Sequence, residues 1–129
     1  MEKRMSYEEF LYRIKEGVYD ENGNSPVTPI IKFFQVRWRL DVLYYLFTSD
    51  SARFNEIKFN LKGITSSMLS VTLKDLITFG LVDKKDFEEQ PPHVEYSLTE
   101  KGLDLLPMYY EIMNFGFEYG SDFKEKRKK

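Results

Sequence analysis

The chain has 129 residues, 42% of them hydrophobic and 16% aromatic, with a formal net charge of −2, which is ample material for one folded domain with a packed core. It has no cysteine, one histidine and no phosphate-binding glycine motif, and no apolar run approaches the roughly 20 residues that cross a bilayer. Disulfides, thiolate zinc sites and cysteine nucleophiles are thereby excluded, so we expect a cytoplasmic protein that is not an enzyme and has no metal, cofactor or membrane partner.

The N-terminal segment begins with a helix signal. Ser6 and Glu9 form an S-x-x-E capping box, and Tyr7, Phe10 and Ile14 follow at helical spacing, which predicts a helix over residues 6–19. The polar stretch DENGNSP then breaks the chain as a turn or short linker. We expect residues 1–25 to form a helical extension.

A long apolar stretch follows this break. Pro29 suits a first helical turn, and the run IIKFFQ leads through Val36 and Arg37 into WRLDVLYYLF. This segment is apolar nearly all round, so we expect it to be buried as the scaffold of the core.

Two shorter helices are predicted next. Asn55 can cap the helix EIKFNL, which stops at Gly63, and Thr65 can cap a longer helix that ends at Gly80. Two helices joined by a short turn that contains glycine are typical of the helix-turn-helix, although many helical bundles contain the same joint.

The segments LVDKKDF and HVEYSL then read as two strands, joined by the polar connection EEQPP. A β-hairpin directly after the second helix gives the order of a winged helix. We therefore expect a mainly α fold with a small β-hairpin (α+β), in which residues 26–106 form a winged helix-turn-helix DNA-binding domain.

Thr99 caps a last helical region, predicted to reach about residue 121 with a break at Pro107. Its polar residues form one narrow stripe, and apolar side chains cover most of the remaining circumference. Such a helix needs a large partner, and the simplest is the same helix of a second copy. We expect residues 107–129 to be a C-terminal dimerisation helix followed by a frayed basic tail.

The helix predicted after Thr65 has an unusual outer face. Helical phasing buries Leu69, Leu73 and Leu76 and places Ser67, Ser70, Val71, Lys74, Asp75 and Thr78 on the opposite side. Short hydroxyl and methyl groups allow close approach to a DNA groove and can contact phosphates, base edges and thymine methyls. The alternative is an exposed helix face that merely carries little charge.

Charge supports the DNA interpretation, because residues 51–74 hold four cations against one anion. Lysines and arginines there and in the hairpin, Lys58 and Lys62 included, are candidate phosphate contacts or ordinary solvated charges. His93 lies beside the hairpin tip, where it either reaches a minor groove or serves as a turn residue. The candidate DNA-binding residues are Arg53, Thr65, Ser66, Ser67, Ser70, Val71, Lys74, Lys84, Lys85 and His93.

The order ARFNEI, GITSSMLSVTLKDL, GLVDKK and PPHVEYSLTEKG resembles the HxlR-type transcriptional regulators, a winged-helix family of the MarR-like group. The resemblance spans residues 26–120. It implies a homodimeric DNA-binding regulator with a recognition helix over residues 65–79, a wing over residues 81–98 and a dimer interface in the terminal helices. Many relatives carry a cysteine where this chain has Ser25, so thiol-based sensing is excluded.

We therefore expect a transcriptional regulator that binds double-stranded DNA as a homodimer on a pseudo-palindromic operator. Whether a small-molecule effector binds is left open. The alternative is a winged-helix protein-interaction module without specific DNA binding, in which the apolar C-terminal helix docks another polypeptide. The near-neutral total charge favours that alternative.

Overall fold

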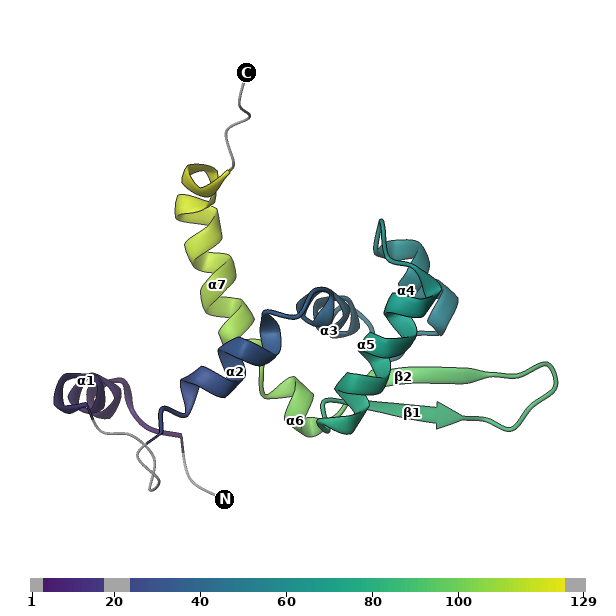
Figure 1. Ribbon diagram of the computed structural model, residues 1–129, viewed down its shortest axis with the longest axis horizontal. Coiled ribbons are helices and arrows are strands. Elements are labelled where there is room, and N and C mark those ends of the chain that lie inside the picture. Colours follow the sequence, from purple (N-terminus) through teal and green to yellow (C-terminus); the bar gives the residue numbers. More distant parts are fainter. Residues whose placement is uncertain (1–3, 18–23, 125–129) are drawn as a thin grey trace. The chain divides into compact units, whose positions relative to one another are not determined.

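The computed structural model describes residues 4–17 and 24–124. The chain divides into two compact units, residues 1–37 and 38–129, which we describe separately (Figure 1). The end predicted for the first helix, most of the DENGNSP turn and nearly all of the basic tail lie outside the described residues. No helix in the described part of the chain is long and apolar enough to span a membrane.

The first unit contains two helices, α1 (Tyr7–Glu16) and α2 (Val27–Phe34). The Ser6 Oγ accepts a hydrogen bond from the Glu9 backbone N–H at 3.1 Å, as the capping box predicts. Gly17 ends α1 with φ +65°, a left-handed conformation that glycine adopts without a steric penalty. Neither helix contains a buried residue.

The long apolar stretch, which its sequence predicted to be one buried segment, forms two separate helices. Helix α2 ends at Phe34 and α3 (Arg39–Phe47) begins only after Trp38, which has φ +79°. A left-handed non-glycine residue cannot continue a right-handed helix, so the break is sharp. The core role holds for α3, where Val42, Leu43 and Leu46 are buried.

The second unit contains the helix-turn-helix. Helix α4 (Phe54–Asn60) is followed by a turn at Gly63, with φ +94°, and by α5 (Ser66–Thr78), which Thr65 caps as predicted. The cap of α4 is Arg53, so the prediction of Asn55 as its cap is wrong. Gly80, with φ +78°, follows the end of α5 and allows the chain to turn into the hairpin.

The hairpin joins strands β1 (Val82–Asp86) and β2 (Val94–Leu98), which pair antiparallel from Val82↔Leu98 to Asp86↔Val94. Ala52, just before α4, forms an isolated bridge with Tyr96 on β2. In Figure 1 the hairpin projects beyond the helices on the side of α5. The predicted mainly α fold with a small hairpin is confirmed.

The core of this unit joins α3, α4, α5 and the hairpin. Its fully buried large side chains are Val42, Leu43, Leu46, Ile57, Leu69, Leu73, Leu76 and Val82. Because α5 gives three leucines to this core, its opposite face is fixed toward solvent.

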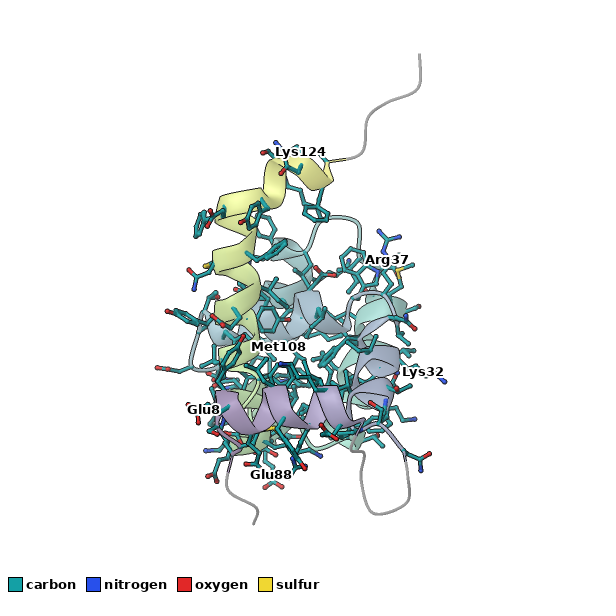
Figure 2. The ribbon with its side chains drawn as sticks, turned by 90° about the vertical axis from the view of Figure 1, so that its left-hand side faces the viewer. Glu8, Lys32, Arg37, Glu88, Met108 and Lys124 are labelled. Atoms are coloured by element: carbon teal, nitrogen blue, oxygen red, sulfur yellow. The ribbon has the colours of Figure 1, made fainter. Side chains whose placement is uncertain are left out.

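The C-terminal segment forms α6 (Glu100–Leu103), α7 (Leu106–Tyr119) and the short 3₁₀ helix η1 (Gly120–Phe123). Thr99 caps α6, and Pro107 lies in the first turn of α7 after the expected break. Tyr109 anchors α7 to α3, because its hydroxyl donates to the Leu40 carbonyl oxygen at 2.6 Å. Figure 2 shows the side chains along α7, the yellow helix that runs from near Met108 toward Lys124.

Candidate nucleic-acid interface

The outer face of α5 is as phasing predicted. Leu69, Leu73 and Leu76 have at most 2% of their surface exposed, whereas Ser67, Ser70, Val71 and Lys74 are exposed. Val71 has 59% of its surface exposed, so its methyl groups are accessible. The result is a rigid helix with a short, mostly uncharged and accessible side.

The N-terminus of α5 adds polar groups to this face. The Thr65 Oγ1 accepts a hydrogen bond from the Met68 backbone N–H at 3.1 Å. Thr65, Ser66 and Ser67 are exposed here, where the unpaired N–H groups of a first helical turn favour an anion such as phosphate. The candidate residues at this end are therefore placed together.

Asp75 departs from the prediction. Phasing placed it on the outer face, but its carboxylate accepts a hydrogen bond from the Arg39 guanidinium at 3.0 Å. The side chains of Arg39 and Asp75 are only 13% and 35% exposed. Asp75 therefore ties α5 to α3 and faces the protein.

Three exposed apolar residues near this face were not singled out by the sequence. Phe59 on α4 is 85% exposed, Met68 on α5 is 43% exposed, and Phe79 after α5 is 52% exposed. The exposed residues extend the accessible surface beyond the serines and Val71.

Arg53 connects the helix-turn-helix to the hairpin. Its backbone N–H donates to the Glu56 carboxylate at 3.4 Å at the start of α4. Its guanidinium donates to the Pro92 carbonyl oxygen at 3.2 Å, in the loop between β1 and β2. Arg53 remains exposed, so a contact with a phosphate and this brace of the loop are compatible.

The two hairpin lysines lie on opposite faces of the strand. Side chains alternate along β1, so Lys84 shares the face of buried Val82, while Lys85 lies on the other face. The Lys85 ammonium is 4.7 Å from the centre of the Phe87 ring. The structure therefore does not bring Lys84 and Lys85 together into one phosphate site.

The remaining candidate cations lie on α4 and in the turn after it. Lys62 is exposed and Lys58 is half-buried. Both line a shallow depression together with Phe59 and Gly63. This places positive charge next to the N-terminus of α5.

His93 is held inside the hairpin loop. Its Nδ1 lies 2.7 Å from the Glu89 carboxylate and its Nε2 lies 2.6 Å from the Glu95 carboxylate. Its ring stacks on Phe87 with 4.2 Å between ring centres. Both ring nitrogens already have partners, so the arrangement does not favour the predicted contact between His93 and a minor groove.

The hairpin is acidic, in contrast to the helix-turn-helix. Residues 82–98 hold two lysines against five carboxylates, a net charge of −3 when His93 is neutral. DNA phosphates repel such a surface at low ionic strength. This predicts that α5 and the α4–α5 turn supply most of the attraction to DNA.

A second surface feature lies between α3 and α7. An open apolar groove of about 310 Å³ is lined by Tyr44, Phe47, Leu106, Pro107, Tyr109, Tyr110 and Met113. Burial raises the pKa of the Tyr109 phenol well above its ordinary value, with smaller contributions from Asp41 and Tyr44. Tyr109 therefore stays neutral and keeps its hydrogen bond to α3. In the part of the chain that the structure describes, no cluster of three carboxylates or histidines is arranged to bind a metal ion.

The model of the HxlR-like helix-turn-helix family matches residues 33–124. HTH-type transcriptional regulator BH0655 of Halalkalibacterium halodurans is 40% identical over 80 residues, which cover 62% of this chain and 71% of the relative. YdzF of Bacillus subtilis, also an HTH-type transcriptional regulator, is 36% identical over 84 residues, covering 65% of this chain and 77% of the relative.

Solved structures agree with these relatives. A structure assigned to the MarR family, from Porphyromonas gingivalis W83, is 37% identical with a TM-score of 0.68, covering 78% of this chain and 96% of its own. The reduced form of the redox regulator HypR is 32% identical with a TM-score of 0.68, covering 74% of this chain and 93% of its own. The quinone-bound form of YodB from B. subtilis is 25% identical with a TM-score of 0.62, covering 71% of this chain and 96% of its own. The chain belongs to the HxlR-like helix-turn-helix family, and it is a transcriptional regulator with a winged helix-turn-helix DNA-binding fold.

Proposed function

We propose that this regulator binds a specific operator through the outer face of α5. The observation that carries the proposal is the exposed set Ser67, Ser70, Val71 and Lys74, which lies opposite three fully buried leucines. Short side chains let the helix enter a major groove, hydroxyls can bond base edges, and the valine methyls suit a thymine methyl. Arg53, Thr65 and Ser66 lie at the edges of this face, where phosphate contacts fix orientation.

We propose further that the protein acts as a homodimer on a pseudo-palindromic DNA site. Helix α7 leaves large apolar side chains uncovered, with Tyr110 66%, Ile112 56%, Phe115 55% and Phe117 84% exposed. Large apolar side chains exposed on more than one side of a helix mark an interface, and the same helix of a second copy is a self-complementary partner. A two-fold dimer places two α5 helices in successive major grooves, about 34 Å apart. In this arrangement residues 1–25 are an extension, residues 26–106 bind DNA and residues 107–129 form the dimer interface. The protein would act in the cytoplasm, the compartment that holds the chromosome.

An effector site is best placed in the apolar groove between α3 and α7. Its lining is almost entirely apolar and includes three tyrosines, which suits a small aromatic molecule. The structural relative YodB binds a quinone. Covalent thiol chemistry is excluded in this chain, which has no cysteine, so an effector would bind by packing and stacking. Ser25, where many relatives carry a cysteine, accepts a hydrogen bond from the Val27 N–H at 3.2 Å.

The test combines three substitutions on the recognition face, Ser67→Ala, Ser70→Ala and Val71→Ala. All three residues are exposed, so the variant is expected to fold with nearly unchanged stability, and Ala raises helix propensity. Each lost base contact should cost about 1–3 kcal/mol at the contacted base pair, which changes the preferred DNA sequence. Thr28→Ala, an exposed residue of α2 outside this face, is the control.

A pool of random duplexes incubated with each protein, followed by sequencing of the bound fraction, gives the preferred site. Unchanged preference and affinity in the triple variant would show that α5 does not read DNA. The rival function is a protein-interaction module that uses the exposed apolar face of α7. The acidic hairpin favours it, and an absence of DNA binding at low salt would support it.

A further inference from the structure

We infer that Glu89, His93 and Glu95 form a proton-dependent wing clamp that positions the hairpin loop and Arg53 for DNA binding. The inference concerns the DNA complex and rests on the proposed function. The clamp itself is a feature of the free protein, so it is tested separately. Nothing in the family comparison assigns a role to these three residues.

The geometry requires a charged histidine. The His93 Nδ1 is 2.7 Å from Glu89 Oε1, and its Nε2 is 2.6 Å from Glu95 Oε2. An ionised carboxylate oxygen only accepts hydrogen bonds, so both ring nitrogens must donate. Only the imidazolium form carries two N–H groups, so His93 must be protonated to donate to both carboxylates at once.

The clamp is connected to the segment that starts α4. The Ser51 hydroxyl donates to the Glu95 Oε1 at 2.6 Å. Arg53 donates to the Pro92 carbonyl oxygen at 3.2 Å, directly before His93. Between these two links, Ala52 and Tyr96 exchange backbone hydrogen bonds of 2.9 and 2.8 Å. The loop that His93 closes is therefore tied to the helix-turn-helix at Arg53.

The charged groups around His93 come from four segments. Glu89 lies in the loop, Glu95 on β2 and Arg53 at the start of α4. The Lys85 ammonium lies over the Phe87 ring, and the His93 ring stacks on that same ring. The hydrogen bonds with Glu89 and then Glu95 raise the pKa of His93, and burial and Arg53 oppose them. The Ser51 hydroxyl, followed by His93, lowers the pKa of Glu95.

The sign of the pH effect follows from these directions. The raised pKa of His93 keeps the imidazolium form present above its ordinary value of 6.5, and the lowered pKa of Glu95 keeps that carboxylate ionised below its ordinary value of 4.5. As pH rises through the raised pKa of His93, one nitrogen loses its proton and its lone pair then faces a carboxylate. At the same time the hairpin charge changes from −2 to −3. The lost hydrogen bond loosens the loop, and the more negative charge increases the repulsion between the hairpin and phosphates. DNA affinity should therefore fall several-fold with rising pH.

The chain contains one histidine, so an NMR titration of the imidazole in the free protein reports the clamp without interference. We expect a midpoint above 6.5 in the wild type and a lower midpoint in the Glu89→Gln variant. Glu111→Gln, on the exposed side of α7, is the matched control and should leave the midpoint unchanged. A wild-type midpoint at or below 6.5 would overturn the clamp.

The positioning role is tested by titrating a fluorescein-labelled random-sequence duplex at low salt across the same pH range. His93→Gln, neutral at every pH, should bind weakly with no step at the His93 midpoint. His93→Arg, charged at every pH, should keep the tight binding of the wild type at low pH. If the DNA affinity of the wild type shows no change at the His93 midpoint, the positioning role is wrong. If the wild type binds no DNA at any pH, the proposed function is wrong instead.

Discussion

The ion pair between Arg39 and Asp75 gives the sharpest test of the structure, because it decides which way one side chain of α5 points. We consider Asp75→Asn, which keeps the size and shape of the side chain and removes its charge. A hydrogen bond to a charged group contributes about 1.5–3 kcal/mol, whereas an exposed ion pair contributes about 0–1 kcal/mol. With 13% and 35% of the two side chains exposed, this pair lies between these cases. We therefore expect a loss of about 1–2 kcal/mol, or roughly 4–10 °C in melting temperature.

Thermal unfolding at a fixed protein concentration measures this loss, with exposed Asp104→Asn as the matched control. A double-mutant cycle with Arg39→Gln should give a coupling energy of about 1 kcal/mol. DNA affinity of the folded Asp75→Asn protein should stay equal or decrease, because the helix loses a tether and gains no contact. An unchanged melting temperature together with tighter DNA binding would refute the reasoning, since removal of a charge that faces phosphates strengthens binding.

Four further outcomes follow from the structure and the proposed function. Gly102→Ala should destabilise the protein by about 3 kcal/mol in chemical unfolding, because the new Cβ would lie 2.3 Å from the Leu81 carbonyl oxygen. A Cβ added at Gly116 has no other atom within 4 Å, so the Gly116→Ala variant should be at least as stable as the wild type. If the proposed dimer forms through α7, Phe117→Lys should shift it to monomer in sedimentation equilibrium. Lys74→Ala should weaken binding to all DNA sequences and reduce the slope of log affinity against log salt by about one.

The parts of the fold that sequence predicted well depend on local patterns. The period of Leu69, Leu73 and Leu76 fixes the buried side of α5, and a capping threonine and a terminal glycine fix its ends. The hairpin is likewise visible as two short strands around a polar turn. Such features need only residues close together in the chain.

The errors arose where distant residues decide the outcome. The run from α2 to α3 keeps an apolar composition through Trp38, so nothing local indicates that α2 ends at Phe34 or that Trp38 is left-handed before α3 begins. Asp75 has the phase of an exposed residue, and its partner Arg39 lies 36 positions away. His93 meets Glu95 and Phe87 only once the hairpin has closed. The exposed positions of α5 were therefore predicted better than the positions of the side chains in the hairpin.

The central claim is that two copies of α5 read a specific DNA sequence. Selection from a random duplex library with the purified wild-type protein, followed by sequencing, tests this claim most directly. If two α5 helices of a dimer bind successive major grooves, we expect an enriched pseudo-palindrome whose half-sites are centred about 10 base pairs, or one helical turn, apart. A bound pool with no enriched sequence, or with one unpaired half-site, would contradict it.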